Sequence, residues 1–277
     1  MIKEGDIPEY ELGKVLGQGG MGTVYLARRK RDGEAVAIKT MLARTAMNEL
    51  ARERFKREVD ATRSLIHPNI VTLYDFNYSG SLFFFVLEYC EGGSLFDVMV
   101  SRNGVLSLVE AAPKFLEVLD GLAYAHEKGF VHRDLKPQNI LLTARTGGVA
   151  KVGDFGLAKS FEDAGLSGLT QTGAAVGTYP YMPREQLTNY KYVKPPTDVW
   201  SMGATIYFVL TGEYPRESPA GQSPIEAIRH GRIVPIRQRK PEIPQGVADA
   251  IDKALANKAA DRYQSAAEFR DGLRGVL

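Results

Sequence analysis

The chain has 277 residues, of which 44% are hydrophobic and 25% are charged, and its formal net charge is +2. These values are ordinary for a soluble globular protein of one large domain or two lobes, and they give no reason to expect nucleic acid or an anionic membrane as the main partner. The single cysteine, Cys90, excludes a disulfide within the chain, and the longest apolar runs, 82–87 and 204–210, are far shorter than the roughly 18 residues that would span a bilayer.

The first predicted strand, residues 10–17, runs into a glycine-rich stretch with the spacing G-x-G-x-x-G at Gly17, Gly19 and Gly22. Such loops let backbone N–H groups approach a phosphate, because glycine has no Cβ in the way. Residues 23–29 alternate β-branched and aromatic types and predict a second strand. A dinucleotide-binding loop would open a helix at this point, so the phosphate-covering flap of a kinase or a hairpin without a ligand remain as interpretations.

A basic run, residues 28–31, is followed by the turn dipeptide Asp32-Gly33. We interpret it as a solvated hairpin tip rather than a nucleic-acid patch. The next strand, 35–41, contains Lys39, which can reach phosphate oxygens as a point charge. Taken alone, this lysine is one of 35 basic residues and carries no assignment.

Residues 48–65 are rich in helix formers and predict a helix. Glu58 falls beside Phe55 and Val59, on the face that we expect to turn inward, where it can pair with Lys39.

Two alternatives stay open for this helix. Glu58 can be a surface residue paired with Arg54, and Glu53 competes as the partner of the lysine. Strands are predicted again at 70–78 and 82–89, so the first ninety residues or so are rich in strands with one helix.

Beyond residue 90 the pattern is helical. Ser107 and Glu110 have capping-box spacing at the start of a helix that runs to Gly129, and Pro113 is expected to bend it or shift its start. Residues 196–212 form a nearly all-apolar stretch that predicts a buried helix. Further helices are predicted near 223–231, 246–256 and 265–274.

The stretch "HRDLKPQN", residues 132–139, is the most informative in the chain. Asp134 is a candidate base for a substrate hydroxyl, Lys136 can steady a transferred phosphate, and Asn139 offers an oxygen ligand to a hard cation. A polar loop that caps itself explains one or two of its His, Arg, Asp, Lys and Asn residues, but not all five.

A second acidic residue, Asp154, follows the short predicted strand 150–152 and begins the sequence "DFG". A carboxylate at the end of a buried strand is a suitable Mg²⁺ ligand, because Mg²⁺ takes one or two carboxylates together with phosphate oxygens.

These four motifs, in this order and at this spacing, resemble the catalytic domain of a protein kinase, and the resemblance covers residues 10 to about 275. It implies a bilobal α+β fold, with a strand-rich, ATP-covering N-lobe of residues 1–89 that holds one main helix, and a mainly helical C-lobe of residues 90–277. It also implies ATP and Mg²⁺ (or Mn²⁺) as cofactors. The opening loop is then the kinase flap.

The resemblance also implies individual roles. Lys39 pairs with the α/β-phosphates and with Glu58, Asp134 acts as the base, and Asn139 and Asp154 hold the metal. Leu87 is the gatekeeper of the adenine pocket, and the backbone of the hinge at residues 88–90 bonds adenine. The full set expected to bind the nucleotide is Leu16, Gly17, Gly19, Gly22, Val24, Ala37, Lys39, Leu87, Glu88, Cys90 and Leu141.

Finer features are similar to serine/threonine kinases rather than tyrosine kinases, namely Lys136 within D-L-K-P-x-N and Thr178 in "GT". The stretches 19–28 and 254–269 resemble bacterial serine/threonine kinases most closely. By that resemblance Thr170 and Thr172 are phosphate acceptors of an activation loop, and Arg133 can pair with a phosphothreonine. The alternative is that these threonines only decorate a flexible loop.

One motif departs from the family pattern, because A-P-E is replaced by Pro183, Arg184 and Glu185. Glu185 keeps its expected ion-pair partner Arg262. Two displaced prolines, Pro180 and Pro183, fall in the substrate-facing loop, which affects peptide docking more than ATP chemistry.

Two further positions bear on the active conformation. Asp198 is expected to brace the catalytic loop. Thr62 stands one turn after Glu58, where the family usually has an apolar residue, and this change is expected to loosen the active position of the helix.

We therefore expect a serine/threonine protein kinase that uses MgATP to phosphorylate proteins and is regulated by activation-loop autophosphorylation, with a dimer as one route to phosphorylation in trans. A cytoplasmic location is expected, either for this chain alone or as part of a longer membrane-anchored protein. The rival interpretations are a pseudokinase scaffold, whose signature would be loss of Lys39, Asp134 or Asp154, and a small-molecule phosphotransferase, which usually lacks the Glu185–Arg262 pair. A Rossmann oxidoreductase is the weakest rival, because a strand and not a helix follows Gly22.

Overall fold

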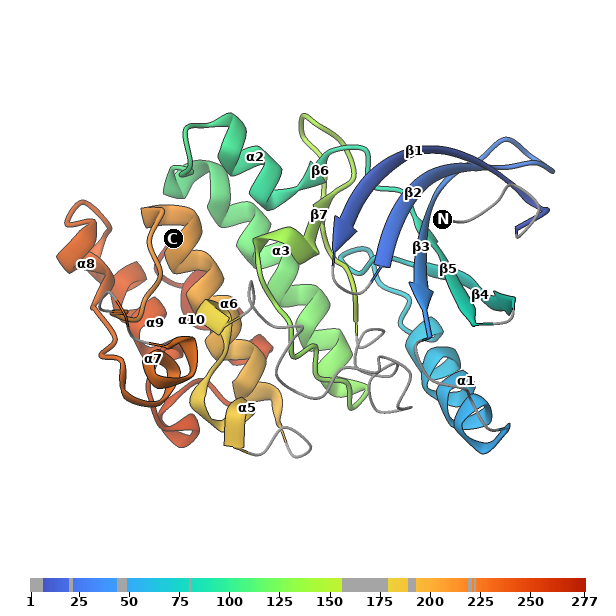
Figure 1. Ribbon diagram of the computed structural model, residues 1–277. Coiled ribbons are helices and arrows are strands. Elements are labelled where there is room, and N and C mark those ends of the chain that lie inside the picture. Colours follow the sequence, from blue (N-terminus) through green and yellow to red (C-terminus); the bar gives the residue numbers. More distant parts are fainter. Residues whose placement is uncertain are drawn as a thin grey trace. The chain divides into compact units, whose positions relative to one another are not determined.

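The structure is a computed structural model that describes residues 7–19, 22–43, 49–79, 81–155, 179–188, 193–218, 221 and 223–277. The described residues form two compact units, each with its own core (Figure 1). We name them the N-terminal unit, with described residues from 7–67 and 71–91, and the C-terminal unit, with described residues from 68–70, 92–155 and 179–277.

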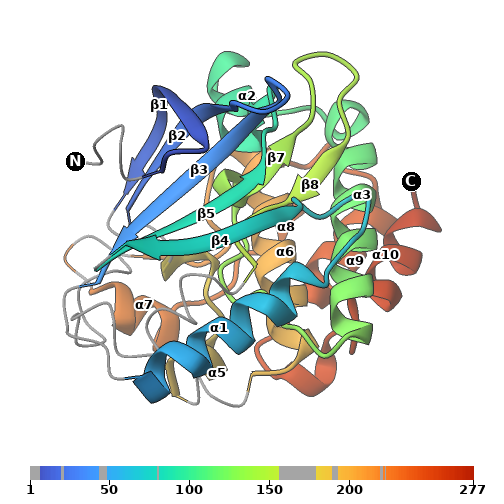
Figure 2. The same cartoon turned by 90° about the vertical axis from the view of Figure 1, so that its right-hand side faces the viewer.

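The N-terminal unit is built on a five-stranded antiparallel sheet with the strand order β1-β2-β3-β5-β4 (Figure 2). The strands are β1 (Tyr10–Gly19), β2 (Gly22–Arg29), β3 (Ala35–Leu42), β4 (Leu73–Ser79) and β5 (Leu82–Glu88). The predicted strands are confirmed, and the glycine-rich stretch joins two strands rather than opening a helix. The basic run closes the β2–β3 hairpin, where Arg29 Nε donates to Asp32 at 3.0 Å.

One face of this sheet carries the helix α1 (Glu49–Arg63). Phe55 and Val59 are both 1% exposed, and the ring of Phe55 meets those of Phe76 and Phe83 edge-on, at centroid distances of 5.5 and 5.3 Å. Edge-to-face aromatic pairs add to the free energy gained by burial alone. This aromatic contact places α1 against β4 and β5 (Figure 2).

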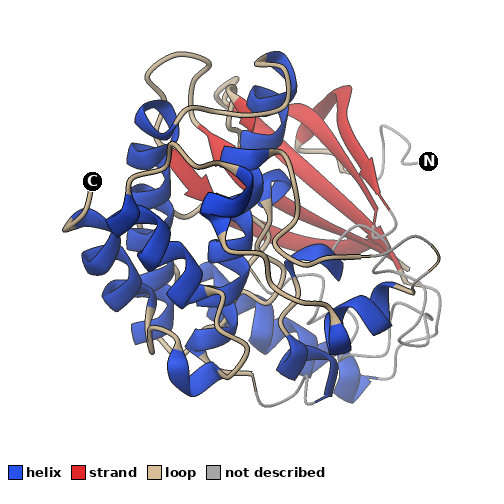
Figure 3. Cartoon of the chain, turned by 90° about the vertical axis from the view of Figure 1, so that its left-hand side faces the viewer, coloured by secondary structure: helices blue, strands red, loops and turns tan. Residues whose placement is uncertain are grey.

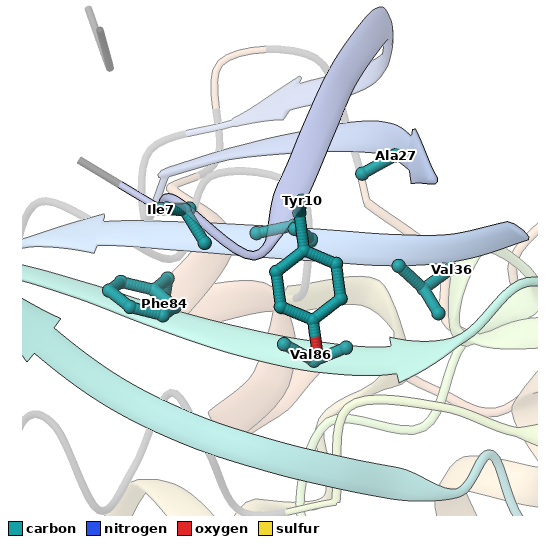
Figure 4. Packing of buried hydrophobic residues seen from close by; sticks show 7 residues of the cluster. Ile7, Tyr10, Ala27, Val36, Phe84 and Val86 are labelled. Atoms are coloured by element: carbon teal, nitrogen blue, oxygen red, sulfur yellow. The ribbon is translucent and has the colours of Figure 1, made fainter. Parts of the chain in front are cut away.

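The opposite face of the sheet has a separate hydrophobic cluster (Figure 4). Side chains alternate between the two faces of a strand, so odd and even positions of β3 serve different cores. In this cluster Ile7, which precedes β1, packs against side chains of the strands. Its members are Ile7, Tyr10, Ala27, Val36, Ile38, Phe84 and Val86.

The C-terminal unit is mainly helical (Figure 3). Its helices are α2 (Leu95–Ser101), α3 (Leu108–Glu127), α5 (Arg184–Thr188), α6 (Pro195–Thr211), α7 (Pro224–His230), α8 (Ile236–Arg239), α9 (Gln245–Ala254) and α10 (Ala266–Arg274), with short 3-10 turns η1 (Pro137–Asn139), η2 (Tyr179–Tyr181) and η4 (Ala259–Asp261).

The start of α3 agrees with the sequence. The predicted capping box forms, with Ser107 Oγ accepting the N–H of Glu110 and the Glu110 carboxylate accepting the N–H of Ser107. Pro113 lies inside α3 and does not shift its start, because the cap has already set it at Leu108.

The helix α6 is the core of this unit. Trp200, Met202, Ile206 and Tyr207 are completely buried on different sides of the helix, as the all-apolar sequence predicts. The helix ends at Gly212, whose φ of 76° is a left-handed conformation that glycine adopts without strain.

A small three-stranded sheet, β6 (Gly93–Ser94), β7 (Ile140–Leu142) and β8 (Ala150–Val152), frames the "HRDLKPQN" stretch. Ile140 pairs with Val152, and the N–H of Gly153 donates to the carbonyl of Asn139 at 2.8 Å. This ladder brings the residues before Asp154 next to Asn139. Among the helices that the structure describes, none has the length and apolar character required to cross a bilayer.

Candidate active site

A buried carboxylate holds the backbone of the catalytic loop, residues 132–139. Asp198, in the first turn of α6, is 0% exposed. Its two oxygens accept the N–H groups of His132 at 2.7 Å and Arg133 at 2.9 Å. His126 Nε2 adds a third bond at 2.9 Å. A carboxylate in a helix N-terminal turn that accepts several donors is a strong anchor, so the predicted bracing role of Asp198 has a structural basis.

The charge of Asp198 persists in spite of its burial. Burial alone would raise its pKa, but the hydrogen bond and the charge of His126, together with the backbone bond from Arg133, outweigh that effect and leave the pKa of Asp198 below its ordinary value. The anchor is therefore an ionised carboxylate at neutral pH.

The ring of His132 connects the loop to the strand that leads to Asp154. Its Nδ1 accepts the N–H of Asp134 at 3.2 Å, so the proton lies on Nε2, which donates to the carbonyl of Gly153 at 2.7 Å. The same ring meets Phe155 edge-on at 4.7 Å. His132 thus links both ends of the candidate site in a single tautomer.

Two backbone positions of the site are strained. Arg133 and Asp154 have φ values of 70° and 60°, in the left-handed region that non-glycine residues rarely adopt. Each such backbone conformation costs on the order of 1–3 kcal/mol of folding free energy and persists only where neighbouring bonds hold it. For Arg133, the bond from its N–H to Asp198 does so.

The candidate base, Asp134, is held by its two neighbours in the motif. Lys136 Nζ donates to the carboxylate at 2.8 and 3.1 Å, and Asn139 Nδ2 donates to its Oδ2 at 3.1 Å and to its backbone carbonyl at 2.8 Å. The Asp134 side chain is 36% exposed, so it remains open to an incoming hydroxyl. The structure brings all three predicted residues together.

The candidate metal ligands lie at neighbouring positions. The amide nitrogen of Asn139 faces Asp134, which leaves its Oδ1 as the atom that can ligate a cation. Asp154 follows Gly153, whose N–H bonds the carbonyl of Asn139. Within the described residues, no cluster of three His, Cys, Asp or Glu side chains supplies a complete protein cage. A Mg²⁺ ion at these two ligands would complete its shell with phosphate oxygens and water, and the residues present fit that requirement.

The glycines of the flap have different roles. A Cβ atom on Gly17 or Gly19 would meet no described atom within 4 Å, so these positions have open space beside their backbone. Gly22 has a φ of 146°, and a Cβ there would lie 1.7 Å from the carbonyl oxygen of Thr40. Gly22 is therefore required by the sheet itself, whereas Gly17 and Gly19 leave room for a ligand.

Four of the predicted nucleotide-binding residues share one face of the five-stranded sheet. Val24 is opposite Lys39, and Ala37 is opposite Leu87, in the observed register. Directly opposite residues of an antiparallel pair point to the same face, and so do alternate residues of one strand. Lys39 is 8% exposed. It lies on the face of the sheet against which α1 packs, because it is opposite Phe85, whose ring Phe55 of α1 contacts.

The remaining predicted contacts are also placed. Leu16 on β1 is 39% exposed, and Cys90 is buried after the end of β5. Glu88 is tied to Thr72, since its N–H donates to the Thr72 carbonyl at 2.9 Å and its carboxylate accepts the Thr72 N–H at 3.2 Å. Leu141 belongs to β7 in the C-terminal unit.

The expectation that Glu58 turns inward is wrong in this structure. Phe55 and Val59 are buried as predicted, but Glu58 is exposed. Glu58 lies at the edge of the buried stripe, because successive residues are about 100° apart around a helix. Its role as the partner of Lys39 stays a prediction.

The altered motif keeps its ion pair. Arg262 Nη1 and Nη2 donate to the Glu185 carboxylate at 2.6 and 3.0 Å, and Arg262 is 3% exposed. Two residues that the sequence interpretation missed also join the site, His126 through Asp198 and Gln186 through a bond of 2.6 Å to the carbonyl of Arg133. No spacing or motif in the sequence marks either one. The predicted residues Thr170, Thr172 and Thr178 lie outside the described part of the chain.

Comparison with known proteins agrees with this geometry. The protein kinase domain family matches residues 10–270. The chain is 38% identical over 271 residues to the serine/threonine-protein kinase PknB of Mycobacterium tuberculosis, which covers 95% of this chain and 42% of that protein. It is 37% identical over 275 residues to the probable serine/threonine-protein kinase SCO3848 of Streptomyces coelicolor, covering 97% of this chain and 40% of the relative.

A third relative, the probable serine/threonine-protein kinase CPE1738 of Clostridium perfringens, is 36% identical over 270 residues, covering 96% of this chain and 38% of the relative. The chain therefore spans about two-fifths of the length of these curated relatives.

Proposed function

The chain belongs to the protein kinase family, and on that premise we propose that it transfers the γ-phosphate of MgATP to serine and threonine hydroxyls of proteins. The observation that carries this proposal is the assembled catalytic loop, in which Lys136 and Asn139 both donate to the carboxylate of Asp134. The names of the curated relatives and the position of Lys136, two residues after Asp134, favour serine and threonine as acceptors.

In the proposed reaction the hydroxyl oxygen of the substrate forms a bond to the γ-phosphorus, and the bond from that phosphorus to the β–γ bridging oxygen breaks. ADP leaves, and the hydroxyl proton passes to the carboxylate of Asp134. Lys136 Nζ, already 2.8 Å from that carboxylate, stays beside the transferred phosphoryl group. Positioning and neutralisation of charge supply most of the catalysis in such transfers.

Asn139 and Asp154 would hold the divalent cation, Mg²⁺ or Mn²⁺. When bound, the cation neutralises phosphate charge. In the N-terminal unit, Gly17 and Gly19 would let backbone N–H groups reach phosphate oxygens, and Lys39 would contact the α/β-phosphates.

The rest of the nucleotide set is proposed to surround adenine and ribose: Leu16, Val24, Ala37, Leu87, Glu88, Cys90 and Leu141. Gly22 shapes the strand beneath the flap. The shared face of Val24, Ala37, Lys39 and Leu87 supports this assignment.

Regulation by phosphorylation is proposed for Thr170 and Thr172, with Arg133 as the cation that would form an ion pair with the phosphothreonine.

Thr178 is proposed to contribute to the recognition of serine and threonine. Phosphorylation in trans within a transient dimer is the proposed route. We further propose that the boundary between the two lobes lies between residues 89 and 90. The chain is proposed to act in the cytoplasm, alone or as the cytoplasmic domain of a longer membrane-anchored protein, with protein substrates rather than nucleic acid as partners.

The pseudokinase interpretation has no support, because Lys39, Asp134 and Asp154 are all present and the similar proteins are named as kinases. A small-molecule phosphotransferase is disfavoured by the Glu185–Arg262 pair, whose Nη1–Oε1 distance is 2.6 Å.

The proposed function is tested by mass spectrometry of the purified chain after incubation with MgATP, beside the Asp154→Ala variant. Phosphate on Thr170 or Thr172 in the wild type alone is the expected result. Phosphate in both proteins would point to a contaminating kinase. Absence of phosphate from the wild type, on these threonines and on an added protein substrate, with ATP binding intact, would contradict the proposal.

A further inference from the structure

The segment of residues 179–183, which we name the docking segment because the sequence places it in the substrate-facing loop, has few backbone donors of its own. It comprises η2 with Met182 and Pro183, and neither Pro180 nor Pro183 has an N–H group. Within the segment, the N–H of Met182 donates to the carbonyl of Tyr179 at 3.1 Å. Carbonyl groups in such a segment need donors from elsewhere in the unit.

One such donor is Arg216, which follows α6. Its Nη1 donates to the carbonyl of Met182 at 2.6 Å, and its guanidinium carbon lies 4.1 Å from the ring centroid of Trp200. Arg216 is 7% exposed and Trp200 is completely buried. Stacking on an indole offsets part of the cost of burying a cation. Arg216 therefore fastens the middle of the docking segment to the core of the unit.

A second arginine, Arg184, immediately follows the docking segment and donates to carbonyls of another element. Its Nε donates to the carbonyl of Ile228 at 3.0 Å, and its Nη2 donates to the carbonyl of Gly231 at 3.2 Å. Both acceptors are at the C-terminal end of α7, where helix carbonyls lack partners within the helix and a cation is favoured by the helix dipole. The planar fork of arginine reaches both carbonyls at once.

The family motif has proline at this position, and proline cannot supply a side-chain donor. A lysine would supply one charged group without the fork. Two residues further along, Gln186 bonds the carbonyl of Arg133, directly before Asp134. A single short helix, α5, thus joins α7 to the catalytic loop through side chains two residues apart.

The pKa of Arg216 reflects the charges around this junction. Burial, followed by the nearby cations Arg184 and Arg262, lowers the pKa of Arg216 to about 9, and only Glu185 acts in the opposite direction. Arg184, Arg216 and Arg262 therefore lie close enough together for their charges to interact.

We propose that Arg184 is a positioning residue for protein substrates, which holds the docking segment against the end of α7 so that an incoming peptide meets a fixed surface. This rests on the proposed kinase function. Loss of Arg184 weakens capture of the protein substrate and leaves the use of ATP unchanged, because none of its bonds involve the catalytic loop or the metal ligands.

The test uses the full 277-residue chain as enzyme and its Lys39→Met form as the protein acceptor. Arg184→Met keeps an unbranched apolar stem of similar width and removes both bonds. We expect the KM for the acceptor to rise by roughly five- to twentyfold, as the loss of charge-assisted hydrogen bonds typically produces. The KM for ATP and the rate of ATP hydrolysis without acceptor should stay within about twofold of the wild type. Arg184→Lys should recover part of the loss.

The matched control is Arg237→Met on α8, which also removes two arginine bonds, to the carbonyl of Pro241 at 3.2 Å and to the side chain of Gln245, away from the docking segment. It should leave every parameter unchanged. Hydrogen exchange of the amides in 224–234 should quicken in Arg184→Met and not in Arg237→Met.

An unchanged acceptor KM in Arg184→Met overturns the proposal, and so do equal losses in the acceptor and ATP parameters or an exchange rate that does not change. A wild-type chain that fails to phosphorylate the acceptor at all overturns the proposed function itself, and this is seen before any variant is made.

Discussion

Two regions of the molecule differ in how closely their side chains match the arrangement expected from the sequence. One is the catalytic loop of the C-terminal unit, and the other is the Lys39–Glu58 pair expected in the N-terminal unit. In the loop, Asp134 already receives bonds from Lys136 and Asn139, and its backbone is fixed by Asp198. In the N-terminal unit, Lys39 is buried on β3 while Glu58 is exposed on α1. The candidate catalytic residues of the loop contact one another, whereas the glutamate of the expected pair is exposed to solvent.

The physical reason is the length of chain that separates the groups. Asp134, Lys136 and Asn139 lie within six consecutive residues, so closing their loop costs little entropy, and a buried carboxylate secures it. Lys39 and Glu58 lie on separate elements, and the packing of α1 depends on Phe55 and Val59 rather than on the glutamate. The contrast predicts that changes in the loop affect chemistry and stability, whereas changes at Glu58 affect activity alone.

The largest expected effect is that of Asp134→Asn. Removing the base should reduce phosphoryl transfer by about 10²- to 10⁴-fold, the usual contribution of a positioned acid or base. ATP binding should be nearly unchanged, since this carboxylate is bonded to residues of its own loop. Radiolabelled phosphate transfer and calorimetric ATP titration measure the two quantities. Turnover equal to the wild type would remove Asp134 from the role of base.

The next largest effect is that of Asp198→Asn on stability. The new amide would turn a donor toward the N–H groups of His132 and Arg133, leaving a buried donor without an acceptor, at a cost of about 3 kcal/mol in the free energy of unfolding. The matched control is Asp120→Asn, which breaks a partly exposed pair with Arg270 and should cost less than about 1 kcal/mol. Chemical denaturation measures both, and equal losses would show that Asp198 is no anchor.

The same carboxylate predicts a pH dependence. Because the pKa of Asp198 lies below its ordinary value of 3.8, its stabilising effect is fully present above that value and is lost as the pH falls through the lower folded pKa. The difference in Tm between the wild type and Asp198→Asn should therefore be constant from about pH 7 to about pH 5 and shrink below about pH 4. A difference that widens in acid would mean that the folded pKa is raised instead.

A smaller effect is expected for Glu58→Gln. If the glutamate pairs with Lys39 in the working enzyme, transfer should fall roughly tenfold, equal to about 1.4 kcal/mol, while the Tm stays the same because the side chain is exposed. Glu53→Gln, whose exposed pair with Arg57 spans 3.7 Å, is the matched control and should be silent. Equal activity losses in both variants would favour Glu53 or a general charge effect.

The smallest expected effect is that of Thr62→Leu on α1. The Thr62 hydroxyl donates to the carbonyl of Glu58 at 3.1 Å, a local bond that slightly weakens a helix. Leucine removes it and has a higher helix propensity, so the unfolding free energy should rise by about 0.5 kcal/mol. Basal activity should rise with it if α1 limits the active state. A lower Tm in thermal denaturation would show that the leucine is not accommodated.

The site was predictable wherever its residues lie close together in the sequence. The catalytic loop, the strand lysine and the capping box of α3 each have a local pattern that constrains the structure, and all three are found as predicted. His126 and Gln186 were not predictable, because their contacts with Asp198 and with the carbonyl of Arg133 join residues 72 and 53 positions apart. A hydrogen bond to a backbone carbonyl places no demand on the acceptor residue that a sequence could display.

The sequence by itself determined the strands, the main helices, the order of the motifs and the candidate residues for the chemistry, since these depend on residue type and short spacing. Only the tertiary structure decided the direction of Glu58, the distinct roles of the three flap glycines and the anchoring of the altered motif by Arg184 and Arg216. Each of these depends on which atoms of distant segments come within hydrogen-bond or van der Waals range, and that is settled by the packing of the whole unit rather than by any local run of residues.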